Sequence, residues 1–145
     1  MKNVSGAIIT VLILLSCSTP PDSSKNDQDK VASDFAMGLE TGDIELLMSA
    51  YHQNADFTFI DLDGNKNILN GAEEIREAQQ ANFEQGMLAA EVLVDTWKKE
   101  KNGDSIRYRI IVSFDAFQFM NTLELITIDG DWGIIHQKVE FYSVK

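Results

Sequence analysis

Apolar and polar side chains alternate along most of the last third of the chain, 87–142, as they do in β-strands with one covered face. Turn signals divide this alternation into four predicted strands, at about 88–99, 106–114, 122–128 and 132–142. Asn102-Gly103 and Asp129-Gly130 tolerate the positive φ of tight hairpin turns, so the first and third connections are predicted to be hairpins. The rest of the chain must cover the apolar face of this sheet.

The second of these strands separates its side chains most clearly into two sets. Its apolar set is Ile106, Tyr108, Ile110, Val112 and Phe114, and its other set is Arg107, Arg109, Ile111 and Ser113. Phe117 and Phe119 then break the parity, and a one-residue slip sends every later side chain to the opposite face. A β-bulge or a turn is therefore expected near Asp115 and Ala116, and it should curve the sheet.

Ahead of the sheet, apolar residues recur every three or four positions, which predicts helices that pack by one face. Val31, Phe35 and Leu39 mark a first helix, which Gly42 is expected to end. Asp43 is the expected N-cap of a second, short helix, because its side chain can accept a hydrogen bond from the first turn. Two helices are therefore predicted to meet at this junction.

The segment between these helices and the long strands is predicted to hold a short strand at 56–60, a turn at 61–65 and a third helix. Asn70 followed by Glu73 resembles a capping box that opens this helix, and Gly86 is expected to stop it. Helices followed by long antiparallel strands predict the α+β class. We expect about three N-terminal helices packed against a curved antiparallel sheet.

The first 16 residues have a different pattern and are predicted to be a lipoprotein signal peptide. Lys2 precedes a short apolar run, 7–15, which is too short to span a bilayer, since a spanning helix needs roughly 20 residues. The stretch 14–17 resembles a bacterial lipobox, which implies cleavage before Cys17 and a lipid on its sulfur. We therefore expect a protein anchored by lipid at the periplasmic or outer face of a bacterial envelope. The alternative is an ordinary secretory signal.

Composition divides the remainder into a flexible tether, 17–30, and one domain, 31–145. The segment 18–30 has two prolines, three serines and no large apolar residue, so it buries too little surface to order itself. The chain has 12 basic against 23 acidic residues, a formal charge of −11, which argues against nucleic acid as a partner and against membrane contact beyond the lipid anchor. Its single cysteine allows no internal disulfide.

Four short stretches, in the same order, resemble the nuclear transport factor 2-like superfamily, including its SnoaL-like and ketosteroid-isomerase-like members. They are 42–47, 51–57, 70–75 and 129–136, and they span nearly all of the predicted domain. The resemblance implies a cone-like fold in which a curved sheet and helices enclose an apolar pocket, often in homodimers that pair through the sheet. The residues expected in that pocket are Phe35, Tyr51, Phe57, Phe59, Tyr108, Glu124, Ile126 and Trp132.

The same resemblance bears on catalysis. Isomerase-like members place a general-base aspartate on the first strand and a tyrosine on a helix, and the matching residues here are Phe59 and Phe35. Neither can exchange a proton, and only Glu124 falls where those members hold a second acid. We therefore expect a binding or accessory module for a small hydrophobic molecule or an envelope protein. The alternative is an isomerase, dehydratase or hydrolase that uses Glu124 and His136.

No metal site or cofactor is predicted. The stretch 61–67 resembles a calcium loop, but Lys66 and Ala72 stand where that loop requires glycine and glutamate. His52 and His136 are the only histidines, and a zinc site would need carboxylates beside them. A homodimer is expected to form through an apolar sheet face, because leaving that face exposed would create a large apolar patch. The residues assigned to it are Ile111, Phe117, Phe119 and Val139.

Overall fold

The computed structural model describes residues 27–144, apart from the side chains of 94–98. The predicted signal peptide, Cys17 and most of the predicted tether lie outside the described residues. No helix among the described residues is long and apolar enough to cross a membrane. The elements are α1 (Gln28–Thr41), α2 (Ile44–Ser49), β1 (Tyr51–Ile60), β2 (Lys66–Asn70), α3 (Ala72–Glu84), β3 (Glu91–Asn102), β4 (Ser105–Ser113), β5 (Phe117–Ile128) and β6 (Asp131–Val144).

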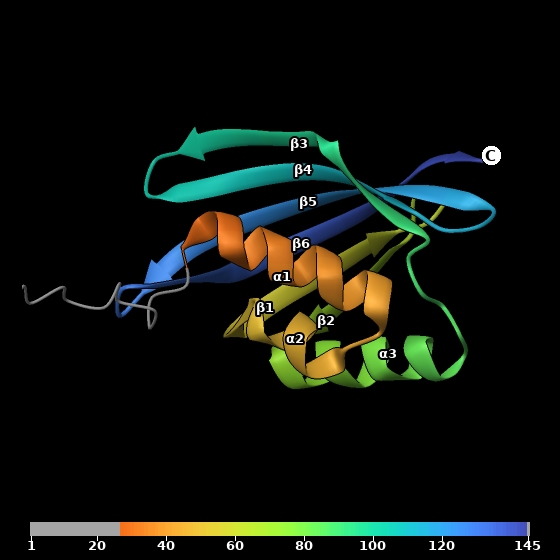
Figure 1. Ribbon diagram of the computed structural model, residues 1–145, viewed down its shortest axis with the longest axis horizontal. Helices are drawn as coiled ribbons and strands as arrows, with labels where there is room; N and C mark the ends of the chain where they lie inside the picture. Colours follow the sequence, from red (N-terminus) through yellow and green to blue (C-terminus); the bar gives the residue numbers. More distant parts are fainter. Residues whose placement is uncertain (1–26, 145) are drawn as a thin grey trace, which may run out of the picture.

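The strands of the described chain form one six-stranded sheet in the order β2-β1-β6-β5-β4-β3. Figure 1 shows the sheet curving over α1, with α2 and α3 on the same side below it. This arrangement confirms the predicted α+β class, with three helices packed on one face of a curved sheet. Neighbouring strands are antiparallel except β1 and β6, which run parallel. That pairing joins the first strand to the last one.

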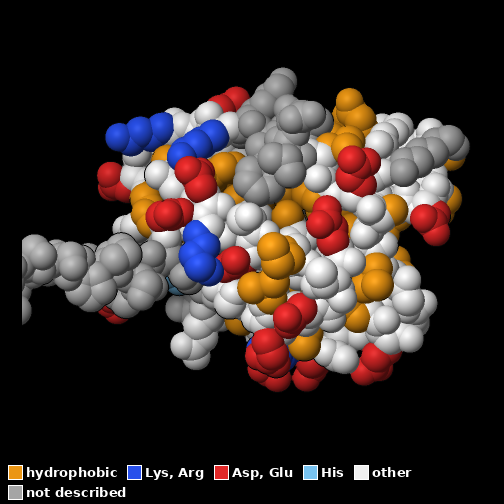
Figure 2. All heavy atoms as spheres, viewed as in Figure 1, with side chains coloured by type: hydrophobic (Ala, Val, Ile, Leu, Met, Phe, Trp, Pro, Cys, Tyr) orange, Lys and Arg blue, Asp and Glu red, His pale blue; other side chains and the backbone are white. Residues whose placement is uncertain are grey.

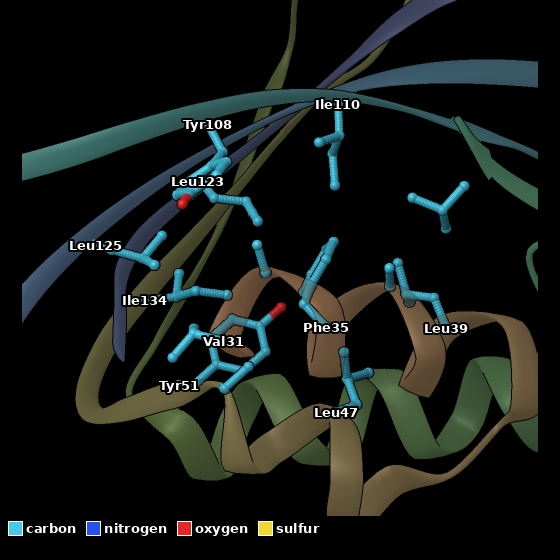
Figure 3. Close-up of a cluster of buried hydrophobic side chains, with 14 of the residues drawn as sticks. Val31, Phe35, Leu39, Leu47, Tyr51, Tyr108, Ile110, Leu123, Leu125 and Ile134 are labelled. Atoms are coloured by element: carbon cyan, nitrogen blue, oxygen red, sulfur yellow. The ribbon is translucent and has the colours of Figure 1, made fainter. Parts of the chain in front are cut away.

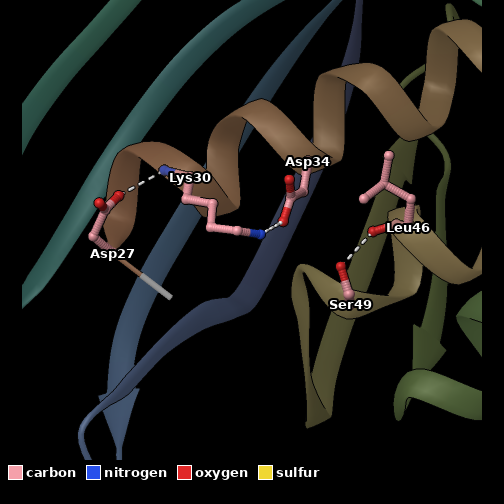
Figure 4. Close-up of polar contacts among 5 residues, drawn as sticks. All are labelled: Asp27, Lys30, Asp34, Leu46 and Ser49. Atoms are coloured by element: carbon pink, nitrogen blue, oxygen red, sulfur yellow. Dashed lines mark hydrogen bonds and ion pairs between the residues drawn. The ribbon is translucent and has the colours of Figure 1, made fainter. Parts of the chain in front are cut away.

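Local hydrogen bonds end the first helix and begin the second as predicted, whereas the start of the first helix was not predicted. Asp27 caps α1, because its Oδ1 accepts from the Lys30 backbone N–H at 2.7 Å, so α1 begins inside the segment predicted as tether. Figure 4 shows this cap together with the ion pair between Lys30 and Asp34. Gly42, at φ 71°, ends α1, and Asp43 then caps α2 by accepting from the next turn at 3.0 Å.

The start of α3 differs from the prediction. The N-cap is Gly71, at φ 88°, and no side chain caps the helix, so the capping box of Asn70 and Glu73 is wrong. Asn70 is the last residue of β2 and pairs with Asp56, while its backbone N–H donates to Glu74 Oε2 at 2.7 Å. The sequence did not predict β2, because this five-residue edge strand is almost entirely exposed and lacks an apolar alternation.

The two faces of β4 are those predicted. Tyr108, Ile110 and Val112 are buried on the helix side, and Arg107 and Arg109 point to the opposite face. The parity break after β4 is a turn rather than a bulge, since the Phe114 N–H donates to the Phe117 carbonyl at 2.8 Å. The bulges lie in β6 instead, where Ile135 and Tyr142 are extra residues against β5.

The core lies between α1, α2 and the helix side of the sheet. Figure 3 shows side chains of these elements pointing toward one another, with Phe35 of α1 near the centre. The labelled members are Val31, Phe35, Leu39, Leu47, Tyr51, Tyr108, Ile110, Leu123, Leu125 and Ile134, all of them buried. Apolar side chains fill the helix side, and the charged side chains of β4 and β5, among them Arg107, Arg109 and Glu124, lie on the opposite face beside apolar ones such as Met120.

Candidate functional site

Among the hollows on the described part of the chain, two lie beside the predicted site residues Phe59, Glu124 and His136, and they differ in chemistry. The phenylalanine hollow, of about 380 Å³, lies where β1 and β6 end and β5 begins, and is lined by Phe59, Asp61, Leu62, Asp63, Phe117, Phe119 and Phe141. The polar hollow, of about 690 Å³, lies on the face away from the helices. Its charged and titratable side chains are Asp56, Lys66, Arg107, Arg109, Glu124, His136, Lys138 and Glu140.

Phe119 is the centre of the phenylalanine hollow. Its ring centroid lies 5.9 Å from that of Phe59, 5.8 Å from Phe114, 6.4 Å from Phe117 and 5.9 Å from Phe141. Three of these contacts are edge-to-face, an arrangement that aromatic rings favour because of their quadrupoles. Phe117 remains 48% exposed, so the aromatic cluster is open to solvent on one side. Such a surface can hold an apolar molecule.

The rim of this hollow is the turn between β1 and β2. The Asp61 carboxylate accepts hydrogen bonds from the Asp63 backbone at 2.9 Å, the Asn65 backbone at 2.8 Å and the Asn65 amide at 3.0 Å. The Asn65 side-chain bond and these backbone bonds hold the pKa of Asp61 below its usual value. Asp61 therefore shapes the turn as an ionised carboxylate. Within 27–144, no group of three or more His, Cys, Asp or Glu is placed to hold a metal ion.

The eight residues expected in one apolar pocket are spread over both faces of the sheet. Phe35, Tyr51 and Tyr108 are buried in the core, and Phe57 and Trp132 pack against it. Only Phe59 lines the phenylalanine hollow, while Glu124 lines the polar one. Ile126 is half-buried and follows the parity of Glu124 on β5. The parity of β5 sends these last two away from the helices.

Tyr108 has a structural contact at the start of α1. Its hydroxyl donates to the Asp29 carboxylate, which also receives Lys99 Nζ at 3.2 Å. The hydrogen bond from Tyr108, followed by that from Lys99, lowers the pKa of Asp29, and burial together with that same bond raises the pKa of Tyr108. The three side chains therefore fasten the first turn of α1 to β3 and β4.

A buried chain of polar side chains crosses the inner face, and the sequence did not predict it. The Tyr51 hydroxyl donates to Gln137 Oε1, and Gln137 Nε2 donates to Asn121 Oδ1 at 2.8 Å. Both amide residues are 3% exposed, and burial raises the pKa of Tyr51, so its hydroxyl stays protonated. Asn121 and Gln137 share the parity of buried apolar neighbours, and this interruption of the pattern is the signal that could have found them.

Glu124 and His136, the candidate acid and base, are brought together by the fold. They are direct partners across β5 and β6, and both line the polar hollow. The Ser105 hydroxyl donates to Glu124 Oε1 at 2.8 Å, and His136 Nδ1 lies 2.6 Å from Asp56 Oδ2. An ionised carboxylate only accepts hydrogen bonds, so Nδ1 carries the proton and Nε2 of a neutral ring is left as the basic atom.

His52, the other histidine, has a packing role. Its Nε2 lies 3.1 Å from the carbonyl oxygen of Ile126, which can only accept, so this nitrogen carries the proton. The ring lies against Gly133, where an added Cβ would be 3.1 Å from the ring. Gly133 of β6 therefore leaves the space in which His52 of β1 reaches the Ile126 carbonyl of β5.

The residues assigned to an apolar dimer face do not share one face. Ile111 belongs to the face away from the helices and is buried, while Phe119 and Val139 pair with residues of the helix side. The remaining member, Phe117, opens onto the phenylalanine hollow. The prediction that these four residues form one exposed apolar face is therefore wrong, because the register after β4 places them on different faces, while the homodimer itself stays a prediction. Any pairing through the outer face would meet polar side chains.

No protein-family model matches the chain. No curated protein matches it either. Solved structures do match, and one is a nuclear transport factor 2-like protein of unknown function from Shewanella baltica. It has a TM-score of 0.65 and 16% identity, and the match covers 79% of this chain and 90% of that chain.

Two further solved structures also match the chain. A protein of unknown function with a cystatin-like fold, from Nostoc punctiforme, has a TM-score of 0.61 and 18% identity, over 79% of this chain and 87% of that chain. A nuclear transport factor 2-like protein of unknown function from Methylobacillus flagellatus has a TM-score of 0.61 and 17% identity, over 79% and 89%. At these identities the likeness concerns the fold, and the chain has the nuclear transport factor 2-like fold that its sequence resembles.

Proposed function

We propose that the protein is an exported, lipid-anchored binding module that holds a small apolar molecule in the phenylalanine hollow. The observation that carries this proposal is the cluster around Phe119, four rings with centroids within 6.4 Å of its own, left partly open at the end of the sheet. The hollow of about 380 Å³ is at the small end of the range for ligand pockets, roughly 300–1,000 Å³.

The lining also indicates the charge of the ligand. Asp61 and Asp63 are the charged side chains of the hollow, and the hydrogen bonds to Asp61 keep it ionised. A carboxylate rim repels anions, and the phenylalanine faces attract apolar groups and cations. We therefore infer a neutral or cationic molecule with an aromatic or branched apolar body.

Phe119→Ala is expected to weaken binding about tenfold or more, because each aromatic pair contributes about 0.5–1.5 kcal/mol beyond the area it buries. Fluorine NMR would measure the affinity, with neutral fluorinated benzenes, indoles and naphthalenes titrated into the exported protein. Phe119→Leu keeps apolar volume and should retain part of the affinity. Tyr142→Ala is the matched control, since Tyr142 is 56% exposed on β6 but does not line the hollow.

Two results would contradict this proposal. One is the absence of binding by every compound up to the limit of its solubility. The other is an affinity that stays unchanged in the Phe119→Ala variant, provided that the melting temperature of this variant shows that it folds normally. Affinity for an envelope protein that depends on Phe117 and Phe119 would instead assign the hollow to a protein partner.

The lipid anchor is proposed from the sequence alone, since Cys17 lies outside the described residues. Mass spectrometry of the membrane fraction should find a diacylglyceryl group on the N-terminal Cys17, because the stretch 14–17 resembles a lipobox. Cys17→Ser should block the lipid attachment and move the protein out of the lipid-anchored membrane fraction, with Ser18→Ala as the matched control. An unmodified mature N-terminus released to the medium would refute the anchor.

A second candidate is an enzyme of the isomerase, dehydratase or hydrolase type. The observation in its favour is the pairing of Glu124 with His136 in the polar hollow, where Asp56 holds His136 Nδ1 at 2.6 Å. His136 Nε2 could then act as base and Glu124 as acid. Turnover that is lost in both Glu124→Gln and His136→Gln, and retained in Phe119→Ala, would favour this enzyme over the binding module.

A further inference from the structure

We propose that the polar hollow is a binding site for a small organic dicarboxylate, held by the guanidinium groups of Arg107 and Arg109. This inference is independent of the phenylalanine hollow, which lies at another part of the sheet. The polar hollow occupies the face away from the helices, and its volume of about 690 Å³ suits a small molecule.

The first argument is which charged side chains of the hollow already have a hydrogen-bond or ion-pair partner. Each of its carboxylates has one. Asp56 is bound to His136 at 2.6 Å, Glu124 to the Ser105 hydroxyl at 2.8 Å, and Glu140 to Lys138 at 2.8 Å.

The cations of the hollow are different. Lys66, Arg107 and Arg109 form no hydrogen bond or ion pair with any side chain that the structure describes, and all three line the hollow. Arg107 lies opposite Glu124 across β4 and β5, and in the structure the Glu124 carboxylate accepts from Ser105 and not from Arg107. The side chains left open to a ligand are therefore cationic, and with four Lys and Arg against three Asp and Glu the lining has a formal charge of +1, although the whole chain has −11.

The second argument is the geometry of the two arginines. They lie two positions apart on β4, so they point to the same face with Cα atoms about 7 Å apart. A guanidinium presents a planar fork that binds a carboxylate through two parallel hydrogen bonds. Two forks at this spacing match two carboxylates joined by a chain of about four to six carbons in all.

The floor of the hollow completes the site. Thr122 lies opposite Arg109 across β4 and β5, and its hydroxyl can donate to a carboxylate oxygen. Met120 and Ile60 supply apolar surface for the carbon chain, and Thr58 adds a second hydroxyl on β1. Arg107 is half-buried, which keeps its fork less hydrated than that of a fully exposed side chain and favours binding.

The test is calorimetric titration of the exported protein, residues 17–145, with succinate, glutarate and adipate. Acetate and inorganic phosphate are the comparison anions. We expect at least one dicarboxylate to bind about tenfold more tightly than acetate or phosphate. Arg107→Gln and Arg109→Gln should each weaken that binding about tenfold or more, because each removes charge-assisted hydrogen bonds.

Two controls separate the site from a general effect of charge. Arg76→Gln makes the same substitution on α3, where Arg76 pairs with Glu45 at 2.6 Å, and should leave the affinity unchanged. Phe119→Ala should also leave it unchanged, so failure of the apolar site and failure of this one are distinguishable. In NMR spectra, the ring signals of His136 should shift during the titration, since His136 lines the hollow.

Three results would overturn the proposal. The first is an affinity for dicarboxylates no greater than for acetate or phosphate. The second is binding that Arg76→Gln weakens as much as Arg109→Gln does. The third is a second copy of the chain on this face, shown by a light-scattering dimer that Arg109→Gln dissociates and that excludes every dicarboxylate.

Discussion

Gly38→Ala is expected to lower the free energy of unfolding by about 1–3 kcal/mol, the usual cost of overpacking a tight core. A Cβ added at Gly38 would lie 2.7 Å from the N, Cα and Cβ atoms of Leu47, closer than real Cβ atoms approach other atoms. Leu47 is fully buried in α2, so its backbone cannot move aside without opening the contact between α1 and α2. Urea unfolding followed by circular dichroism would measure the change.

The intrinsic helix preference works against this effect. Alanine favours a helix interior over glycine by about 1 kcal/mol, so any net loss of stability reports the clash with Leu47. Ser33→Ala is the matched control, because Ser33 lies on the exposed side of the same helix. A Gly38→Ala variant as stable as the Ser33→Ala variant would mean that α1 and α2 can separate at little cost.

Gln137→Leu is expected to destabilise the domain by about 2–6 kcal/mol, because it leaves two buried polar groups without a partner at about 1–3 kcal/mol each. These are the Tyr51 hydroxyl, which donates to Gln137, and the Asn121 amide oxygen, which accepts from it at 2.8 Å. Leucine has nearly the same side-chain volume as glutamine, so the substitution leaves no large cavity. The loss should therefore come from the polar chain, and thermal and urea unfolding would both register it.

A double-mutant cycle makes this prediction sharper. Tyr51→Phe alone removes one donor, and Tyr51→Phe combined with Gln137→Leu leaves fewer unpaired groups than the two separate changes together. The double variant should therefore be more stable than additivity predicts. Gln53→Leu, at an exposed position of β1, is the control for the substitution itself. Additive losses would show that Tyr51 and Gln137 are not coupled.

The elements that depend on local chemistry were predictable from the sequence. Gly42 ends α1 with a positive φ. Asp43 begins α2, because its Oδ1 accepts from the Leu46 backbone N–H at 3.0 Å. Gly103 and Gly130 take the positive φ of the two predicted hairpins. The two faces of β4 follow from strict alternation. In each case the residues responsible lie within a few positions of one another, so backbone preference and short hydrogen bonds settle the outcome.

The candidate sites depended on pairings that local chemistry does not determine. Alternation divides a strand into two sets of side chains, but it does not say which set the helices cover. Glu124 was therefore expected among the pocket residues, whereas β5 and β6 place it beside His136 on the outer face.

The register of β6 could not be predicted either, because the extra residues Ile135 and Tyr142 shift it against β5. The sequence by itself determined the helices, most of the strands and the α+β class, through interactions over short stretches of chain. The tertiary structure alone decided the parallel pairing of β1 with β6, the burial of the polar chain through Gln137 and the cluster around Phe119. These contacts join residues that are far apart in the chain, and such contacts form only when the whole core is buried.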